Sequence, residues 1–213
     1  MVNTGRLKRR IIEFLRKPLR KKYSDSVISK EFTIFSSNCI GGTMYHDAMA
    51  KFLSPTINLT IPDFLSFVEN FDRFINADIT FLSTNDSNRH FDFLLNNKLL
   101  VKMYHSISMD EALDNWIKRR ERITSNIFIV ATDEFVRSDL DKKRFDKLPY
   151  PKVCFVSRSP EYDWEIYLPE FKKTGVVQDA TRICFLSLKR IYQQHFNYIK
   201  WINDGFAKYY SDK

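Results

Sequence analysis

EFTIFSSNCIGGTMYHD, residues 31–47, is the stretch that decides the fold of this chain. Its first six residues are mostly apolar, β-branched or aromatic, which predicts a short buried strand. Asn38 to Gly42 interrupt that run, and helical spacing follows from Thr43 to Phe52. A strand that leads through a sharp turn into a helix is the basic unit of an α/β protein.

The same alternation continues along the rest of the chain. Strands are predicted at 56–59, 77–82, 91–95, 99–104, 126–131, 152–157 and 164–168, and helices at 62–71, 108–123, 137–147 and 179–210. This order predicts an α/β protein with a three-layer α/β/α arrangement and a mainly parallel sheet. The short connection at 96–98 predicts a hairpin, which would give the sheet a mixed edge. We expect residues 31–213 to form one domain, preceded by a separate segment at 1–30.

The positive charge is confined to the start of the chain. The 213 residues carry a formal net charge of +8, and residues 1–22 hold nine Lys and Arg side chains against one Glu. The remaining residues are therefore neutral in sum. A neutral body offers no basic face for a phosphate backbone, so nucleic acid is not an expected partner.

Residues 1–22 have the pattern of a basic amphipathic helix. Leu7, Ile11 and Leu15 follow helical spacing, with cations between them. Such a helix lies on an anionic membrane surface, or it is a solvated helix whose apolar stripe packs on the domain. No stretch approaches the roughly 20 apolar residues of a spanning helix, and no secretory signal is recognisable. We expect a cytoplasmic protein, in peripheral contact with the inner face of the cell membrane if the first alternative holds.

The three cysteines are widely spaced and odd in number, which argues against a disulfide framework. Cys154 and Cys184 lie in apolar runs and are expected to be inert core residues. No CxxC pair or HExxH motif occurs, so no metal site is expected.

Cys39 is the candidate nucleophile, because it stands between the first predicted strand and a helix. The amides of Ile40, Gly41 and Gly42 would be unpaired donors at a helix N-terminus, where a negative charge is favoured. They would lower the pKa of the thiol and could receive an oxyanion. Acyl-transfer enzymes expose a nucleophile in this way. The alternative is a structural cysteine beside a tight Gly-Gly turn.

Four further residues could assist Cys39. Asn38 adds a side-chain donor beside the thiol, and His46, about one turn into the helix, is a candidate base. His105 ends the hairpin and Asp133 follows the central strand, so both are expected at carboxyl ends of strands. Asp, His and Cys from different loops would form a catalytic triad. The alternatives are a structural histidine and an Asp133 that caps a helix.

Arg119 and Arg120, with Arg122, form a basic cluster late in the helix predicted at 108–123. The cluster could bind a phosphate or a nucleotide diphosphate. Cations in the last turn also complement the helix dipole, and this simpler interpretation is favoured.

Three segments stand out together: SSNCIGGTMYHDAMAKFLSPTINLTIPDFLSFVENF, YHSISMDEALDNWIKRRERI and RFDKLPYPKVCF. They resemble a bacterial family labelled exopolysaccharide-biosynthesis proteins, which carries a domain of unknown function. The resemblance spans about residues 31–177 and includes a pattern similar to SNNCWGGEIYHD. Ser37 and Thr43 depart from that pattern, whereas its Cys, Gly-Gly and Tyr-His-Asp match here. The resemblance implies an α/β/α fold and a place in surface-polysaccharide synthesis.

In such a protein, we expect six residues to contact the substrate: Asn38, Gly41, Gly42, Tyr45, Arg119 and Arg120.

A weaker similarity, limited to Asn38-Cys39 and the fold class, is to capsule acetyltransferases. It implies acetyl-coenzyme A as an acyl donor rather than a bound cofactor. We therefore expect a Cys39-dependent O-acyltransferase that acts on a glycan or a lipid-linked saccharide. A glycosyltransferase-like protein that binds nucleotide sugars and a non-catalytic assembly factor are the alternatives.

Overall fold

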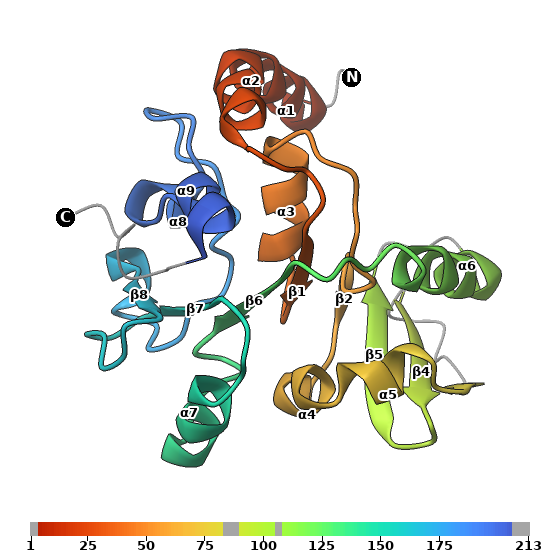
Figure 1. Ribbon diagram of the computed structural model, residues 1–213. Coiled ribbons are helices and arrows are strands. Elements are labelled where there is room, and N and C mark those ends of the chain that lie inside the picture. Colours follow the sequence, from red (N-terminus) through yellow and green to blue (C-terminus); the bar gives the residue numbers. More distant parts are fainter. Residues whose placement is uncertain (1–3, 83–89, 105–107, 206–213) are drawn as a thin grey trace.

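The computed structural model describes residues 4–82, 90–104 and 108–205 (Figure 1). These residues form two four-stranded sheets, one parallel with the order β1-β6-β7-β8 and one antiparallel with the order β2-β5-β4-β3. The α/β class is confirmed. The predicted hairpin is present, but it belongs to the second sheet and is not an edge of the parallel one.

The parallel sheet is covered by helices on both faces. Its strands are β1 (Thr33–Ser36), β6 (Ile127–Thr132), β7 (Lys152–Val156) and β8 (Glu165–Tyr167). In Figure 1, one face is covered by α3 (Ile40–Asp47), α8 (Ile191–His195) and α9 (Tyr198–Asp204), and the other by α7 (Asp139–Asp146). The central strand alternates between two cores: Phe128 and Val130 pack under α3 and α9, whereas Ile129 and Ala131 face α7.

The second sheet forms a lobe beside the first. It contains β2 (Leu59–Thr60), β3 (Ile79–Phe81), β4 (His90–Leu95) and β5 (Leu99–Tyr104), and it packs with α4 (Phe64–Glu69), α5 (Phe71–Ile75) and α6 (Met109–Arg120). The turn between β4 and β5 has positive φ angles at Asn96 and Asn97, which asparagine tolerates well. Ser108 caps α6 by accepting a hydrogen bond from the Glu111 amide, as its sequence position predicts.

Side-chain hydroxyls separate the two sheets. One edge of β1 pairs with β6. At the other edge, the Ile34 amide donates to the Tyr45 hydroxyl at 2.8 Å, and the Ser36 amide donates to Thr56 Oγ1 at 2.9 Å. Because these amides are already bonded, no strand of the second sheet can pair with β1.

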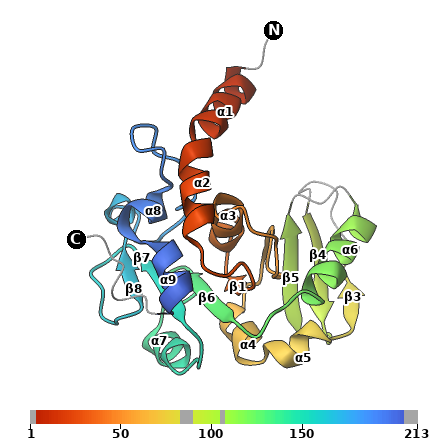
Figure 2. The same ribbon diagram turned by 45° about the horizontal axis from the view of Figure 1, so that its top comes forward.

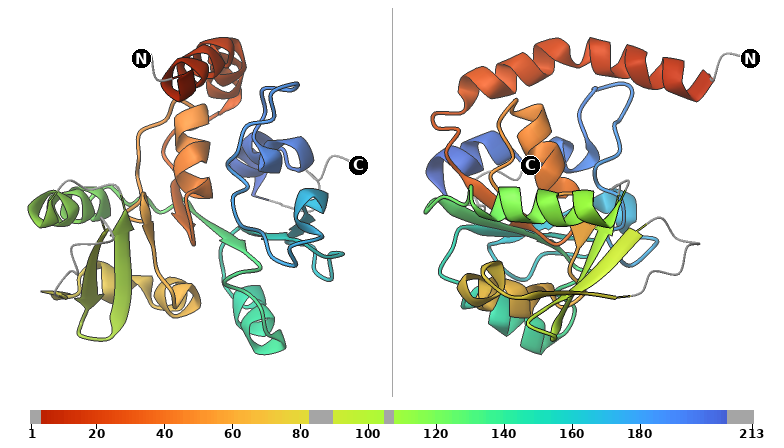
Figure 3. Two further views of the ribbon diagram at one scale, coloured as in Figure 1. Left: turned by 180° about the vertical axis from the view of Figure 1, so that it is seen from behind. Right: turned by 90° about the vertical axis from the view of Figure 1, so that its right-hand side faces the viewer.

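Two helices, α1 (Thr4–Leu15) and α2 (Lys17–Ser26), lie outside the sheets. Figures 2 and 3 show α1 extending away from the body of the protein. Ile11 and Leu15 are exposed, so they do not pack on the domain as one alternative proposed. The face that turns inward carries Ile12 and the fully buried Arg16. No helix in the described ranges is long and apolar enough to span a bilayer.

The single helix predicted at 179–210 is wrong in its first part. Residues 179–190 form an extended hairpin that closes through a bridge between Ile183 and Arg190, and helix starts only at Ile191. The extended backbone of Phe196 then separates α8 from α9. The apolar periodicity did not predict this because Arg190 is drawn into a buried ion pair, which overrides local helix preference.

Candidate functional site

A groove lies between α1, α3 and the 179–190 hairpin. Its volume of about 930 Å³ is in the range of small-molecule sites. The walls combine a thiol, an imidazole, hydroxyls and cations. Its lining comes from three parts of the chain. These are Ile12 and Glu13 of α1; Cys39, at the N-cap of α3, with Gly42, Thr43 and His46 of that helix; and Thr181, Arg182 and Arg190 of the hairpin.

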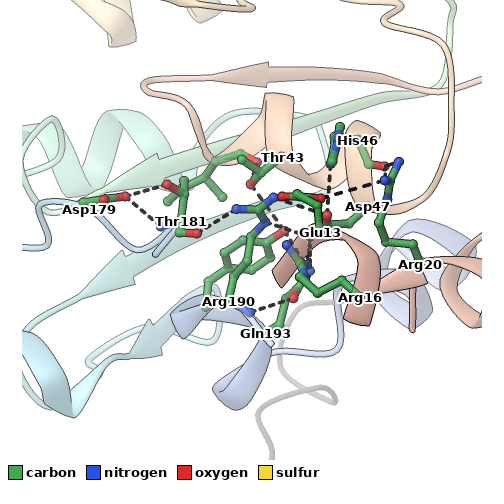
Figure 4. Close-up of polar contacts among 12 residues, drawn as sticks. Glu13, Arg16, Arg20, Thr43, His46, Asp47, Asp179, Thr181, Arg190 and Gln193 are labelled. Atoms are coloured by element: carbon green, nitrogen blue, oxygen red, sulfur yellow. Dashed lines mark hydrogen bonds and ion pairs between the residues drawn. The ribbon is translucent and has the colours of Figure 1, made fainter. Parts of the chain in front are cut away.

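Asp47 is the buried centre beneath this groove. Its Oδ2 accepts hydrogen bonds from Arg16 Nη2 at 2.6 Å, Arg190 Nε at 2.7 Å and Gln193 Nε2 at 2.8 Å. Figure 4 shows these three side chains converging on Asp47 from separate parts of the chain. The carboxylate therefore ties α1–α2, α3 and α8 together.

The Asp47 cluster contains more positive than negative charge. Burial alone would raise the pKa of Asp47, but hydrogen bonds from His46 and Arg190 and the charges of Arg190 and Arg16 outweigh it, so the pKa is well below its usual value. Arg16 is wholly buried, and its Nε and Nη1 atoms have no partner in the described structure. It is thus not a surface cation of a basic tail.

His46 is held by the same carboxylate. Its Nδ1 lies 3.2 Å from Asp47 Oδ1, and Arg20 donates to the His46 carbonyl oxygen at 2.9 Å. The side chain remains 43% exposed and lines the groove. No described residue bonds Nε2, so this nitrogen is available to a substrate in the groove. An imidazole oriented by a buried carboxylate is the arrangement of a general base.

Cys39 also lines the groove, but its surroundings differ from those expected. It is exposed at the N-cap of α3, seven residues and about two turns from His46, or roughly 10 Å along the helix axis. Because the helix begins at Ile40 rather than Thr43, His46 lies almost two turns into it instead of the expected one, and His46 does not bond the thiol. Although the residue as a whole is exposed, atoms packed around its sulfur displace water; this partial burial, with a smaller contribution from the Asp179 charge, raises the thiol pKa rather than lowering it. Asp179 is held near by its bonds to Thr181 (Figure 4).

Two of the three amides expected to receive an oxyanion are already used, and a role of the third, that of Gly42, stays a prediction. Ile40 donates to Asn38 Oδ1 at 3.0 Å, and Gly41 donates to Ser36 Oγ at 3.1 Å. The side-chain oxygen of Asn38 therefore supports the turn as an acceptor, and a contact of its side-chain nitrogen with substrate stays a prediction. A Cβ on Gly41 would lie 2.6 Å from Ser36 Cβ, so this glycine allows α3 to approach β1. Gly42 has no such crowding and faces the groove.

Tyr45 has a structural position. It is fully buried, accepts from the Ile34 amide and donates to the Phe32 carbonyl oxygen at 2.9 Å. Burial raises its pKa. Because both of its hydroxyl interactions are made within the protein, the expected contact with substrate is wrong.

Asp133 lies at the carboxyl end of β6, as predicted, but away from Cys39. Its Oδ2 accepts from the amide and hydroxyl of Ser157, at 2.8 and 2.7 Å, and its Oδ1 accepts from the Val177 amide at 2.7 Å. It lines a different groove, so it does not complete a triad with Cys39. His105, the other expected member, lies outside the described residues.

Arg119 and Arg120 anchor α6 to the body. Arg119 Nη1 donates to the Ile57 carbonyl oxygen at 2.8 Å, and Arg120 Nη1 donates to the Ile75 carbonyl oxygen at 3.1 Å. Burial, and then the charge of Arg122, lower the pKa of Arg119. These bonds give both arginines a structural role, and phosphate binding by them stays a prediction.

Within the described ranges, no group of three His, Cys, Asp or Glu side chains is placed to hold a metal ion. The groove does offer a cation for an anionic part of a substrate. Arg182 is exposed at its wall, whereas the guanidinium of Arg190 is bonded to Asp47 and to the Thr181 carbonyl oxygen. Of these two arginines, Arg182 is the one free to meet a ligand.

Cys184 is not the inert core residue that was expected. It is partly exposed in the 179–190 hairpin, and hydrogen bonds from the Ser187 amide and hydroxyl and the Leu186 amide lower its pKa. Cys154 is buried in the core as predicted.

A family model and a related protein each match most of this chain. The family model described as a domain of unknown function, DUF1919, matches residues 11–203. An uncharacterized protein of Haemophilus influenzae is 30% identical over 195 residues, which cover 89% of this chain and 91% of that protein. The match includes all the residues that line the groove and hold Asp47.

Proposed function

The chain belongs to the DUF1919 family, and we propose that it is an O-acyltransferase of surface-polysaccharide biosynthesis that works in the groove between α1, α3 and the 179–190 hairpin. One observation carries this proposal. The free thiol of Cys39 and the imidazole of His46, which is held by a buried carboxylate, line the same groove. The polysaccharide context rests on the resemblance of residues 31–177 to exopolysaccharide-biosynthesis proteins.

In the first step, the sulfur of Cys39 attacks the thioester carbon of acetyl-coenzyme A. A new carbon–sulfur bond forms, the bond to coenzyme A breaks, and the thiol proton leaves with the coenzyme A thiolate. Because the pKa of Cys39 is raised, the thiolate is scarce at neutral pH. This step should therefore accelerate as the pH rises.

In the second step, a sugar hydroxyl attacks the acyl carbon and His46 Nε2 takes its proton. The bond to Cys39 breaks, and the imidazolium gives the proton back, through the solvent of the groove, to the Cys39 thiolate, which restores the neutral imidazole and the thiol. Seven residues make almost two full turns, so Cys39 and His46 lie on the same face of α3, and the acceptor hydroxyl would enter between the imidazole and the acyl group. Asp47 stabilises the imidazolium that forms.

The test is acylation of the intact protein by acetyl-coenzyme A. We expect one acetyl group per chain by mass spectrometry, located at Cys39, absent from Cys39→Ser and retained in a matched Cys184→Ser control. His46→Gln should still accept the acetyl group but fail to pass it to a saccharide. An adduct-free wild type, or a Cys39→Ser variant that still transfers acetyl to saccharide, would sink the proposal.

A second groove favours one alternative function. It lies at the carboxyl ends of β6 and β7, where α/β proteins bind nucleotides, and it contains Asp133, Arg137, Arg158 and Lys172. A glycosyltransferase-like protein would hold the diphosphate of a nucleotide sugar there. Calorimetry distinguishes the two: binding of UDP-sugars that Arg137→Met weakens, without binding of coenzyme A, would favour the second function.

A further inference from the structure

Large apolar side chains are exposed on both sides of the groove. On α1, Ile11, Phe14 and Leu15 are 49%, 65% and 42% exposed. On the 179–190 hairpin, Phe185 and Leu186 are 63% and 94% exposed. Side chains of this size are costly to leave in water, and clusters of them at projecting elements mark interaction sites.

The two apolar elements flank one opening. Ile12 and Glu13 of α1 form one wall of the groove, and residues 181–183 of the hairpin form the opposite wall. Figure 1 and both views of Figure 3 show the hairpin reaching to the side of the molecule on which α1 lies. A single surface that contacts both elements would therefore also cover the mouth of the groove.

Cations surround these apolar side chains. Arg10 on α1 and Lys17 at the start of α2 are exposed, and Lys17 Nζ lies 5.1 Å from the centre of the Phe14 ring. The hairpin contributes the exposed Arg182 and the half-buried Lys189. Apolar tips with a basic rim match a bilayer that carries anionic head groups.

We propose that α1 and the 179–190 hairpin dock together on an anionic lipid bilayer, so that the groove opens against the membrane surface. Resting on the function proposed above, this orientation selects a lipid-linked saccharide as the acyl acceptor. A soluble glycan would reach the groove only from the side. The apolar tips enter the head-group region, and the cations meet the lipid phosphates.

Co-sedimentation with vesicles tests the docking. The full chain should bind phosphatidylcholine vesicles that contain about 30% phosphatidylglycerol, and bind pure phosphatidylcholine much more weakly. Phe14→Glu and Leu186→Glu should each lower the partition coefficient about tenfold or more, because burying one large apolar side chain is worth at least that factor. The matched control is Leu140→Glu: Leu140 is 67% exposed on α7, away from α1 and the hairpin (Figure 1).

A second readout places the hairpin at the lipid directly. In the Leu186→Trp variant, the emission maximum of the new tryptophan should shift to shorter wavelength when anionic vesicles are added, and brominated lipid should quench this emission. Equal loss of binding in the Leu140→Glu control, no binding to anionic vesicles, or self-association that Phe14→Glu abolishes would each overturn the proposal. The vesicle assay needs no acyl donor, so its failure and failure of Cys39 acylation are independent results.

Discussion

Replacing Asp47 by Asn removes the one negative charge that two buried arginines share. Asp47 and Arg16 are both 0% exposed, and Arg190 is 8% exposed. Breaking a buried ion pair by removing one partner costs about 3–5 kcal/mol, since the other charge stays buried and uncompensated. For a chain of this size, the loss lowers the melting temperature by about 6–20 °C.

Equilibrium urea unfolding followed by circular dichroism measures this loss. With an m-value of about 3 kcal/mol/M, the midpoint of Asp47→Asn should fall by about 1–2 M. Asp139→Asn is the matched control, because its carboxylate is 88% exposed and its partner, the buried Lys142, keeps a second ion pair with Glu161 at 2.9 Å. Its midpoint should stay nearly unchanged, since an exposed carboxylate contributes little and the Lys142 charge stays paired.

The pH dependence checks the same reasoning. The folded pKa of Asp47 lies below the value of about 3.9 for an unfolded Asp, so the stabilisation is complete above that pH and is lost as the pH falls through the folded pKa. The gap between wild type and Asp47→Asn should therefore be constant near pH 7 and narrow below about pH 4. A cost under about 1 kcal/mol, or a gap that does not change on acidification, would refute a buried, ionised Asp47.

Arg16→Met separates charge from packing within this cluster. The substitution removes one guanidinium, together with the two buried nitrogens that have no partner in the described structure. Asp47 keeps its bonds to Arg190 and Gln193. We expect Arg16→Met to destabilise the protein less than Asp47→Asn does, in the same urea assay. A larger loss would mean that Arg16 carries most of the stabilisation.

Three further predictions concern α3 and the cysteines. Gly41→Ala should lower the free energy of unfolding by about 1–3 kcal/mol through overpacking. Gly42→Ala should cost little, because its new Cβ would lie 3.7 Å from the nearest atom, Ile57 Cγ2. Equal losses of stability in the two variants, measured by urea unfolding, would contradict the close approach of α3 to β1. Iodoacetamide should modify Cys39 slowly at pH 7 and faster as the pH rises to 9 and above, and Cys184 should react first; peptide mass mapping would reveal the opposite order. Tyr45→Phe should cost about 1–3 kcal/mol by leaving a buried backbone amide without a partner, and a neutral effect in urea unfolding would show that water replaces the hydroxyl.

Local sequence patterns were sufficient to predict the elements that position the groove. The apolar run before Ser36, the turn at Asn38 and the helix that follows occur together in the structure, although the helix starts at Ile40 rather than Thr43. The central strand and the cap at Ser108 were predicted as well. Each of these depends on neighbours within a few residues, so periodicity and capping rules are enough.

The Asp47 cluster depends on contacts that no local pattern contains. Arg190 lies 143 residues from Asp47 along the chain, so the pair forms only when the fold is complete. A weaker signal was nevertheless present. Asp47 continues the spacing of Ile40 and Met44 on the buried face of α3, and a carboxylate in such a position needs a buried cation.

The raised pKa of the Cys39 thiol and the separation of the two sheets also could not be predicted from the sequence. The pKa of Cys39 is set by atoms packed around the sulfur and by Asp179, which the hairpin brings near. The helix N-terminus argued for the opposite shift, but the Ile40 and Gly41 amides are already bonded. Hydrogen-bond partners of this kind become known only from coordinates.

The Tyr45 and Thr56 hydroxyls, which accept hydrogen bonds from the free edge of β1, affect how the protein behaves at high concentration. An unpaired border strand is a template on which a second chain can add its own strand and start a fibril. Here the Ile34 and Ser36 amides at that border are bonded to side chains from segments that follow directly in the chain. The same short stretch that builds the groove thus protects β1 against the addition of a strand from another molecule. A variant without those hydroxyls should aggregate under conditions in which it is still folded.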